Sequence, residues 1–370
     1  MRLVIGAAIG VFVALSGCGG ASQGGGGTAG SAVSGTAGSG VAGMAGGAAG
    51  SGGGGSGAGG GASGVAGASA GGAGGGGTQS LSLTFGPLTV APAADVTKCV
   101  VVRLGNASAV HVGVIRNQLG AGVINVAVYK SNDTTEQSAP FDCRSVEYYG
   151  SSRDLLMFSR TADDTLTMPA GIGRTFDADQ MIRLEVHAFN DTPDAVAIQT
   201  TTTFTAIADA SFQKEAAAFL IDGANVVVSR GSKQASIFIS VPSSVTAHSF
   251  FAIAGFQHKY GLGVTVATAA GATATPSSPV YAPPSYDWRA PPTVYPTTPF
   301  TVPDGGGFAV TCDWNNTGSK QVSLGPTAAE EACTVVAYYA PGDRFRFCTN
   351  ALDTTFCCPN AEQPQYCVDP

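Results

Sequence analysis

The stretch Gly255-Phe256-Gln257-His258-Lys259-Tyr260-Gly261 decides the fold of this chain. It follows an apolar run over residues 250–254 and precedes Gly263-Val264-Thr265-Val266. An apolar run, a turn marked by glycines and a second β-branched run together predict two consecutive strands. Because side chains two residues apart in a strand point the same way, Phe256 and His258 are expected on one face. A His-x-His pair here would hold a metal, but phenylalanine stands where the first histidine would be.

Similar short runs recur along the chain from about residue 79 onward. Turn residues separate them, and no long segment has the apolar spacing of a helix. This pattern predicts an all-β fold of antiparallel β-sandwiches, and about 290 residues suit two domains. We expect one sandwich over residues 79–208, a second over 209–345 and a Cys-rich tail over 346–370. The main predicted strands are residues 81–85, 99–104, 111–115, 123–130, 181–189, 197–207, 236–241, 250–258, 263–267, 306–314 and 333–339.

The run over residues 181–189 shows the clearest alternation of apolar and polar residues. One face is predicted to be core, and it holds Ile182, Leu184, Val186 and Ala188. The opposite face holds Arg183, Glu185 and His187, and the pattern alone places this histidine at the solvated surface. We treat His111 and His248 as structural. The adjacent acids Asp163-Asp164 and Glu330-Glu331 are expected in solvated faces or turns.

The N-terminus has the features of a secretory signal. Met1-Arg2 precedes an apolar run over residues 3–15 that is too short for a permanent membrane span. The run ends in Leu15-Ser16-Gly17-Cys18, which resembles a bacterial lipobox, so residues 1–18 are predicted to be a lipoprotein signal with Cys18 lipidated. An ordinary cleaved signal with a stray cysteine is the alternative. Gly19 is not an acidic retention signal, so we expect a lipid-anchored protein of the bacterial cell envelope at the outer membrane.

Residues 19–78 are almost entirely Gly, Ala and Ser, and 33 of the chain's 53 glycines lie within the first 80 residues. Such a segment buries too little apolar surface to offset the entropy of ordering, which predicts a disordered tether. Arg2 is the only charged residue before residue 81, so the remaining chain carries 17 basic and 25 acidic residues. This acidic balance argues against a nucleic-acid partner.

Eight of the nine cysteines lie in the part expected to fold, which favours disulfides and an oxidising compartment. The tail contains Cys348, Cys357, Cys358 and Cys367. Metal binding by these four is less favoured, because no pair has C-x-x-C spacing and no histidine lies nearby. Two disulfides stapling a small appendage are expected, and the three possible pairings remain open.

Together these motifs resemble the copper type II, ascorbate-dependent monooxygenases, the group of peptidylglycine α-hydroxylating monooxygenase and dopamine β-monooxygenase. The resemblance covers roughly residues 95–342. It implies two antiparallel β-sandwiches of jelly-roll type, each with one copper. One copper would be held by three histidines and relay electrons. The other, held by two histidines and a methionine, would bind O₂ and hydroxylate a C–H bond.

The resemblance also assigns the six ligand positions, and two of them keep a histidine. In the first domain the adjacent His pair has become Ile124-Asn125, while His187 is retained in a Leu-x-x-His strand. In the second domain the His-x-His motif has become Phe256-Gln257-His258, so His258 is retained. The methionine position falls on Ala332. The resemblance further implies disulfides between Cys99 and Cys143 and between Cys312 and Cys333.

Four substituted positions change the expected chemistry. A single histidine at each site leaves copper mostly to water, and apolar side chains stand where the ion would sit. The leading hypothesis is therefore a non-catalytic envelope lipoprotein that binds an unknown small molecule or peptide between the domains. One alternative is an active copper monooxygenase that uses O₂ and ascorbate. A further alternative is a weak single-site copper protein that uses His187 or His258.

Overall fold

The computed structural model describes residues 68–70, 79–146, 154–223, 226–351 and 354–359. Nearly all of the regular structure in these ranges is β-strand, which confirms the predicted all-β fold. The predicted signal segment with Cys18, most of the predicted tether and Cys367 lie outside the described residues. Among the residues that are described, none belongs to a helix both long and apolar enough to cross a membrane.

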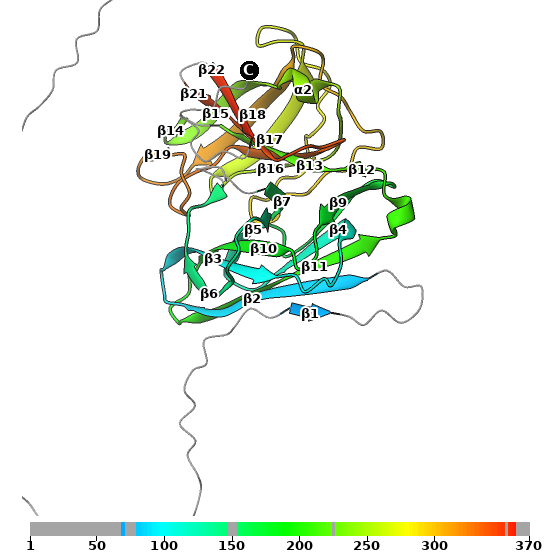
Figure 1. Cartoon of the computed structure of the whole chain (residues 1–370). Coiled ribbons are helices and arrows are strands. Elements are labelled where there is room, and N and C mark those ends of the chain that lie inside the picture. Colours follow the sequence, from blue (N-terminus) through cyan, green and yellow to red (C-terminus); the bar gives the residue numbers. More distant parts are fainter. Residues whose placement is uncertain (1–67, 71–78, 147–153, 224–225, 352–353, 360–370) are drawn as a thin grey trace, which may run out of the picture. The chain divides into compact units, whose positions relative to one another are not determined.

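The first sandwich is built from twelve strands (Figure 1). They are β1 (Ala68–Ala70), β2 (Ser80–Val90), β3 (Asp95–Arg103), β4 (Val110–Leu119), β5 (Val123–Ser131), β6 (Gln137–Asp142), β7 (Asp154–Ser159), β8 (Asp163–Thr167), β9 (Ile172–Phe176), β10 (Met181–Phe189), β11 (Val196–Ile207) and β12 (Lys214–Glu215). One sheet has the order β1-β2-β11-β4-β9-β12, with β8 paired to β4, and the other has the order β6-β3-β10-β5-β7. Because β12 pairs with β9, this sandwich takes a strand from beyond the predicted boundary at residue 208.

A short 3₁₀ turn over Asp209–Ser211 precedes β12, and the second sandwich begins after β12. Its elements are β13 (Ala217–Asp222), β14 (Val227–Val228), β15 (Gly231–Ser240), α2 (Ser243–Thr246), β16 (Ser249–Phe256), β17 (Gly261–Ala269), β18 (Gly307–Asn316), β19 (Val322–Ser323), β20 (Thr334–Ala340), β21 (Arg346–Ala351) and β22 (Thr354–Pro359). The larger sheet has the order β16-β20-β13-β21-β22, a second sheet has the order β15-β18-β17, and β14 pairs with β19. Among the described strands, only β9–β12 and β13–β21 pair in parallel.

The sheet that contains β13, β16 and β20 is buried on both faces. Along β13, Phe219 and Ile221 belong to the core of the second sandwich. The alternate residues Ala218 and Leu220 belong to the core of the first sandwich. Burial on both faces explains why these strands read as nearly continuous apolar runs, since neither face needs polar residues. The core of the first sandwich is therefore shared with one face of this sheet, while the core of the second sandwich forms a separate cluster on the other face.

The predicted tail is part of this sheet, so the expectation of a separate appendage is wrong. Strand β21 pairs in parallel with β13, and β22 pairs with β21. Cys348 and Cys357 face each other in the register of these strands and form a disulfide. Cys358 is also disulfide-bonded. Backbone hydrogen bonding to β13, which the composition of the tail does not reveal, incorporates the segment.

The two disulfides implied by the resemblance are present. Cys99 of β3 is bonded to Cys143, which follows β6. Cys312 of β18 is bonded to Cys333, which lies immediately before β20. The first bond joins β3 to the end of β6, and the second joins β18 to the start of β20, so each disulfide lies within one sandwich.

The expectation of an entirely disordered tether is corrected at one point. Ala68–Ala70 pair antiparallel with β2, in a register that places Ala68 beside Leu83 and Ala70 beside Leu81. Backbone N–H and C=O groups make this pairing, so it requires no bulky side chain. The open edge of β2 therefore supplies hydrogen-bonding partners that the composition of the tether does not disclose.

Candidate functional site

His187 lies in the interior of the protein, not at the solvated surface that alternation predicted. Its side chain is 1% exposed, and Nε2 lies 2.7 Å from Oδ1 of Asp95 at the start of β3. On the other side of the ring, Nδ1 lies 3.4 Å from Nδ2 of Asn125, its direct partner on β5. The ring therefore receives a hydrogen bond from the amide and donates one to the carboxylate. The resemblance placed Asn125 and His187 at one site, and the structure brings them together.

The charge of Asp95 is stabilised by this arrangement. Burial raises its pKa, but the hydrogen bonds from His187 and from the N–H of Ala328 act in the opposite direction and contribute to a net lowering. The pKa of Asp95 therefore lies below its ordinary value. The backbone N–H of Ala328 donates to Oδ2 at 2.7 Å, so both carboxylate oxygens accept hydrogen bonds. No sequence motif singled out Asp95, because its role depends on β3 lying beside β10.

Ile124 occupies the other substituted position in the first sandwich. Asn125 pairs with His187 and Val123 pairs with Ala188, so the register shift leaves Ile124 at a β-bulge. The half-buried Ile124 side chain lines a cavity described below. An sp³ carbon side chain supplies no ligand atom, and the metal position of the resemblance is apolar here.

The substituted position in the second sandwich is a core contact. Phe256 is the last residue of β16 and is 1% exposed. Its ring packs edge to face on Phe158 of β7, with the ring centroids 4.8 Å apart. His258 lies beyond the end of the strand, so the two-residue alternation predicted for it does not apply. It is buried, and its Nδ1 lies 3.0 Å from the carbonyl oxygen of Glu330.

Ala332 stands at the methionine position and is 6% exposed. Its neighbours in the chain are the buried Glu331 and the disulfide-bonded Cys333. A methyl group offers no electron pair to a metal ion. The second sandwich therefore retains one imidazole and no thioether at the positions that the resemblance assigns to copper.

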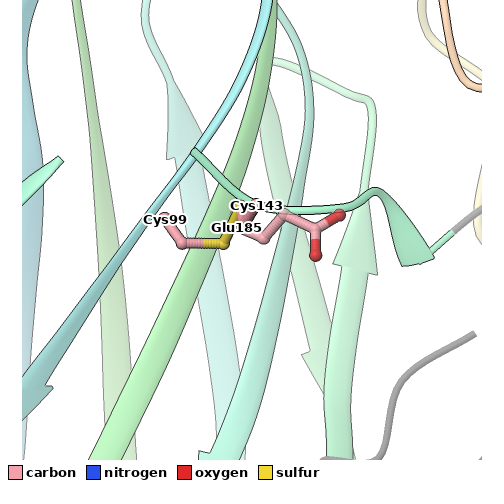
Figure 2. Close-up of side chains that lie close together, drawn as sticks. All are labelled: Cys99, Cys143 and Glu185. Atoms are coloured by element: carbon pink, nitrogen blue, oxygen red, sulfur yellow. A yellow bond between two sulfur atoms is a disulfide. The ribbon is translucent and has the colours of Figure 1, made fainter. Parts of the chain in front are cut away.

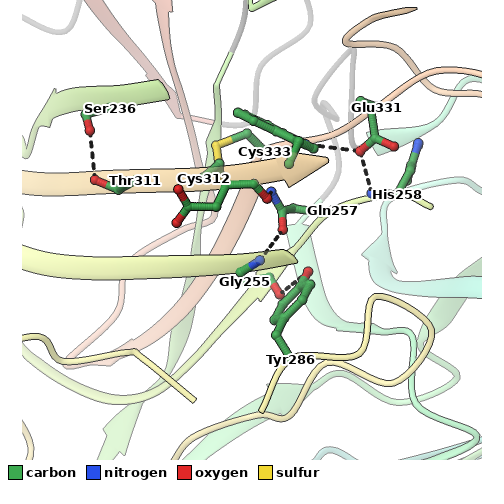
Figure 3. The surroundings of a disulfide bond; sticks show 12 residues. Ser236, Gly255, Gln257, His258, Tyr286, Thr311, Cys312, Glu331 and Cys333 are labelled. Atoms are coloured by element: carbon green, nitrogen blue, oxygen red, sulfur yellow. Dashed lines mark hydrogen bonds between the residues drawn. A yellow bond between two sulfur atoms is a disulfide. The ribbon is translucent and has the colours of Figure 1, made fainter. Parts of the chain in front are cut away.

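Glu331 is a buried functional group that the sequence did not reveal, and its expected place in a solvated pair is wrong. Its carboxylate accepts hydrogen bonds from the backbone N–H of His258 (3.1 Å; Figure 3), from that of Tyr260 (2.8 Å) and from the indole N–H of Trp314 (3.1 Å). Burial raises its pKa, against the lowering effect of the Tyr260 N–H and the charge of His258. The N–H group of a buried tryptophan needs a hydrogen-bond acceptor, so Trp314 in a predicted strand was the feature of the sequence that could have indicated a buried acceptor such as Glu331.

Potential metal ligands converge at one place within the described ranges, and it is not at either histidine. Cys99, Cys143 and Glu185 have ligand atoms within 4.8 Å of one another (Figure 2). The two sulfurs already form a disulfide, while Glu185 accepts hydrogen bonds from Tyr129 (2.8 Å) and the N–H of Val146 (2.9 Å). At His187 both ring nitrogens are engaged by Asp95 and Asn125. At the second site Phe256 and Ala332 leave His258 as one ligand where the resemblance implies three, so neither set of donors fits a copper ion of that kind.

A cavity of about 590 Å³ opens beside these positions, and we call it the interdomain cavity. It is lined from the first sandwich by the start of β3, the start of β5 and the end of β10. From the second sandwich it is lined by the residue after His258, by part of the loop between β17 and β18 and by residues before Glu331. Its charged lining residues are Asp95, Asp191, Lys259 and Arg289, and its larger apolar ones are Val123, Ile124, Phe189 and Trp288.

The two remaining histidines have contacts that fit structural roles. His111 stacks on Phe212 with ring centroids 3.8 Å apart, and its Nδ1 lies 3.0 Å from the Thr175 hydroxyl. His248 precedes β16 and stacks on Tyr339 at 5.6 Å. Neither histidine lines the interdomain cavity.

Comparison with known proteins identifies no family. No family model matches the chain, and no curated protein matches it. Among solved structures, it is similar to the major capsid protein P2 of bacteriophage PM2, with a TM-score of 0.31, 9% identity, and coverage of 70% of this chain and 97% of that one. A putative secreted protein from Parabacteroides distasonis gives a TM-score of 0.18, 7% identity, and coverage of 76% and 88%. The CBM22 tandem domain of Paenibacillus barcinonensis Xyn10C gives 0.17, 10% identity, and coverage of 75% and 91%.

Proposed function

We propose that this chain is a non-catalytic binding module that takes a small ligand in the interdomain cavity. The observation that carries the proposal is that both ring nitrogens of His187 form hydrogen bonds within the protein. Its ring is held between Asp95 and Asn125, which leaves no ring nitrogen for a metal ion in this arrangement. Redox chemistry with copper would require at least one further ligand at the same place. A cavity of this volume lies within the range of small-molecule sites, about 300–1,000 Å³.

The proposal extends to the relationship with copper type II monooxygenases. The sandwich pair, the contact between Asn125 and His187 and the disulfides at Cys99–Cys143 and Cys312–Cys333 support descent from such a scaffold. The substitutions at Ile124, Asn125, Phe256 and Ala332 then mark lost chemistry. Fold alone does not carry function, so the substituted side chains and not the sandwiches decide this reading.

We place the protein in the bacterial envelope, with Cys18 carrying a lipid anchor at the outer membrane. The support is Leu15-Ser16-Gly17-Cys18 after a short apolar run in the sequence, together with the disulfides of the folded part. Fractionation of cells that produce the wild-type chain or the Cys18→Ser variant tests the lipid anchor. The wild-type chain is expected in the membrane fraction and the variant in the soluble fraction.

Copper content tests the proposed function. The full chain carrying Cys18→Ser would be produced in an oxidising compartment, loaded with copper, dialysed and analysed for metal per chain. We expect a value near zero. A value near two would overturn the proposal and lead to an assay of ascorbate-dependent oxygen uptake.

A value near one would instead favour the single-site copper alternative. His187→Gln and His258→Gln would then locate the ion, since removal of its ligand abolishes the retained copper. Measuring copper per chain at several protein concentrations would show whether a second chain contributes ligands.

A further inference from the structure

The wall of the interdomain cavity from the second sandwich carries two available cations. Lys259 and Arg289 are exposed, and neither forms an ion pair with any residue in the described ranges. The Lys259 ammonium lies 4.9 Å above the ring of Tyr260, and the Arg289 guanidinium lies 4.5 Å above the ring of Trp288. These aromatic contacts hold the two cations without neutralising them. Both remain able to bind a carboxylate.

The lining that comes from the first sandwich carries two acids that differ in availability. Asp95 is already engaged, since its two oxygens accept hydrogen bonds from His187 and Ala328. Asp191 follows β10 and is exposed, and its carboxylate has no hydrogen bond or ion pair within the described part of the chain. Asp191 is therefore the acid that can bind an ammonium group.

Apolar side chains lie in the same cavity as these charges. Val123, Ile124 and Phe189 from the first sandwich and Trp288 from the second are all half-buried. An apolar ligand group that covers them would remove this surface from water. Ile124 contributes to this wall at a position where the resemblance expects a metal-binding histidine.

We propose that the interdomain cavity binds a small amphipathic zwitterion, of which an apolar α-amino acid is the simplest example. Its carboxylate faces Lys259 and Arg289, its ammonium faces Asp191, and its apolar group covers Ile124 and its neighbours. Charges of both signs in the lining of one cavity favour a ligand that carries both charges over one that carries either alone. The inference rests on the proposed function, because it assigns a ligand class to the same cavity.

Four probes separate the contributions of the two charges and of the apolar group. The full chain carrying Cys18→Ser would be titrated calorimetrically with L-leucine, N-acetyl-L-leucine, L-leucine amide and glycine. N-acetylation removes the ammonium group, amidation removes the carboxylate, and glycine lacks the apolar group. We expect L-leucine to bind about three-fold more tightly than the two derivatives that lack one charge, as exposed charge pairs allow. It should also bind at least about three-fold more tightly than glycine, which leaves the apolar surface of the cavity in water.

Two cavity variants then assign each end of the ligand to a wall. Asp191→Asn is expected to weaken the binding of L-leucine and of its amide by roughly two- to five-fold and to leave the binding of N-acetyl-L-leucine unchanged. The double variant Lys259→Gln/Arg289→Gln is expected to weaken L-leucine and N-acetyl-L-leucine and to leave the amide unchanged. Asp209→Asn and Lys233→Gln, which replace exposed charges outside the cavity, are the matched controls.

Three outcomes, each obtained with a copper-free chain, overturn the ligand class while leaving the proposed function intact. In the first, the chain binds none of the four probes. In the second, it binds N-acetyl-L-leucine or L-leucine amide as tightly as L-leucine, and in the third, the cavity variants bind the probes as the unsubstituted cavity does. The proposed function fails separately, through a copper content near two per chain. The metal count and the titrations therefore report on different statements.

Discussion

Phe158 and Phe256 pack edge to face, with ring centroids 4.8 Å apart and ring planes at 80°. Phe158 belongs to β7 of the first sandwich and Phe256 ends β16 of the second. Both are fully enclosed members of the apolar core that the first sandwich shares with the sheet containing β16. Position 256, which the resemblance assigns to a metal ligand, is therefore occupied here by a contact that joins the two sandwiches.

This contact predicts a large cost for Phe256→Ala. Truncating a buried phenylalanine removes its contacts and leaves a cavity, which lowers the free energy of unfolding by about 3–5 kcal/mol. Urea denaturation at neutral pH measures the loss. Leu262→Ala is the control, because Leu262 is 57% exposed and its truncation should change stability by less than about 0.5 kcal/mol. Equal effects of the two substitutions would refute the role assigned to Phe256.

The fold could be predicted from the sequence wherever a strand has one face in the core, because apolar and polar residues then alternate along that strand. Ile182, Leu184, Val186 and Ala188 lie in the core as predicted. Alternation was misleading for Glu185 and His187, whose face is also covered. That cover comes from segments far away in the sequence, such as Val146, and from the partners Asp95 and Asn125. Period-2 patterning reports a strand's own two faces and not what later packs on them.

The candidate site was predictable in part for the same reason. The resemblance grouped Asn125 with His187, and adjacent strands do bring them together. Asp95, Lys259 and Arg289 were not singled out, because each reaches the cavity from a different strand end or loop. The burial of Glu331 was also missed. Its acceptor role depends on a buried indole N–H that lies 17 residues away in the chain.

Glu331→Gln is predicted to destabilise the second sandwich although it removes a buried charge. Oε1 accepts the Tyr260 N–H, while Oε2 accepts the N–H groups of His258 and Trp314. An amide has one acceptor oxygen, so its NH₂ group would face a donor, at a cost of about 1–3 kcal/mol. Chemical denaturation at neutral pH measures this cost. Glu330→Gln is the control, since the hydrogen bonds that the Glu330 carboxylate accepts from described residues come from nearby Thr327. A loss of stability equal to that of this control would count against the buried network.

Removal of the first-domain disulfide is predicted to cost more stability than any exposed substitution. Cys99 and Cys143 are separated by 44 residues, and closing a loop of this length restricts the unfolded chain by roughly 4 kcal/mol in the chain-entropy account. The double variant Cys99→Ala/Cys143→Ala should therefore unfold at a lower urea concentration. The wild-type chain measured with and without a reductant provides an independent comparison. A variant as stable as the oxidised wild-type chain would contradict the prediction.

His248 is predicted to make stability depend on pH near neutrality. Burial lowers its pKa below 6.5, with the charge of Asp343 opposing the shift and that of Arg346 adding to it. The unfolded chain therefore takes up the proton first as the pH falls. The contribution of His248 to the free energy of unfolding is complete above its unfolded pKa and is lost as the pH falls through the lower folded pKa.

The variant His248→Phe removes this titration and retains a ring against Tyr339. The free energy of unfolding of the wild-type chain, minus that of the variant, should decrease between about pH 8 and about pH 5. Taking this difference cancels the carboxylates that titrate in both proteins, so a constant difference across the range would show that His248 does not titrate as inferred.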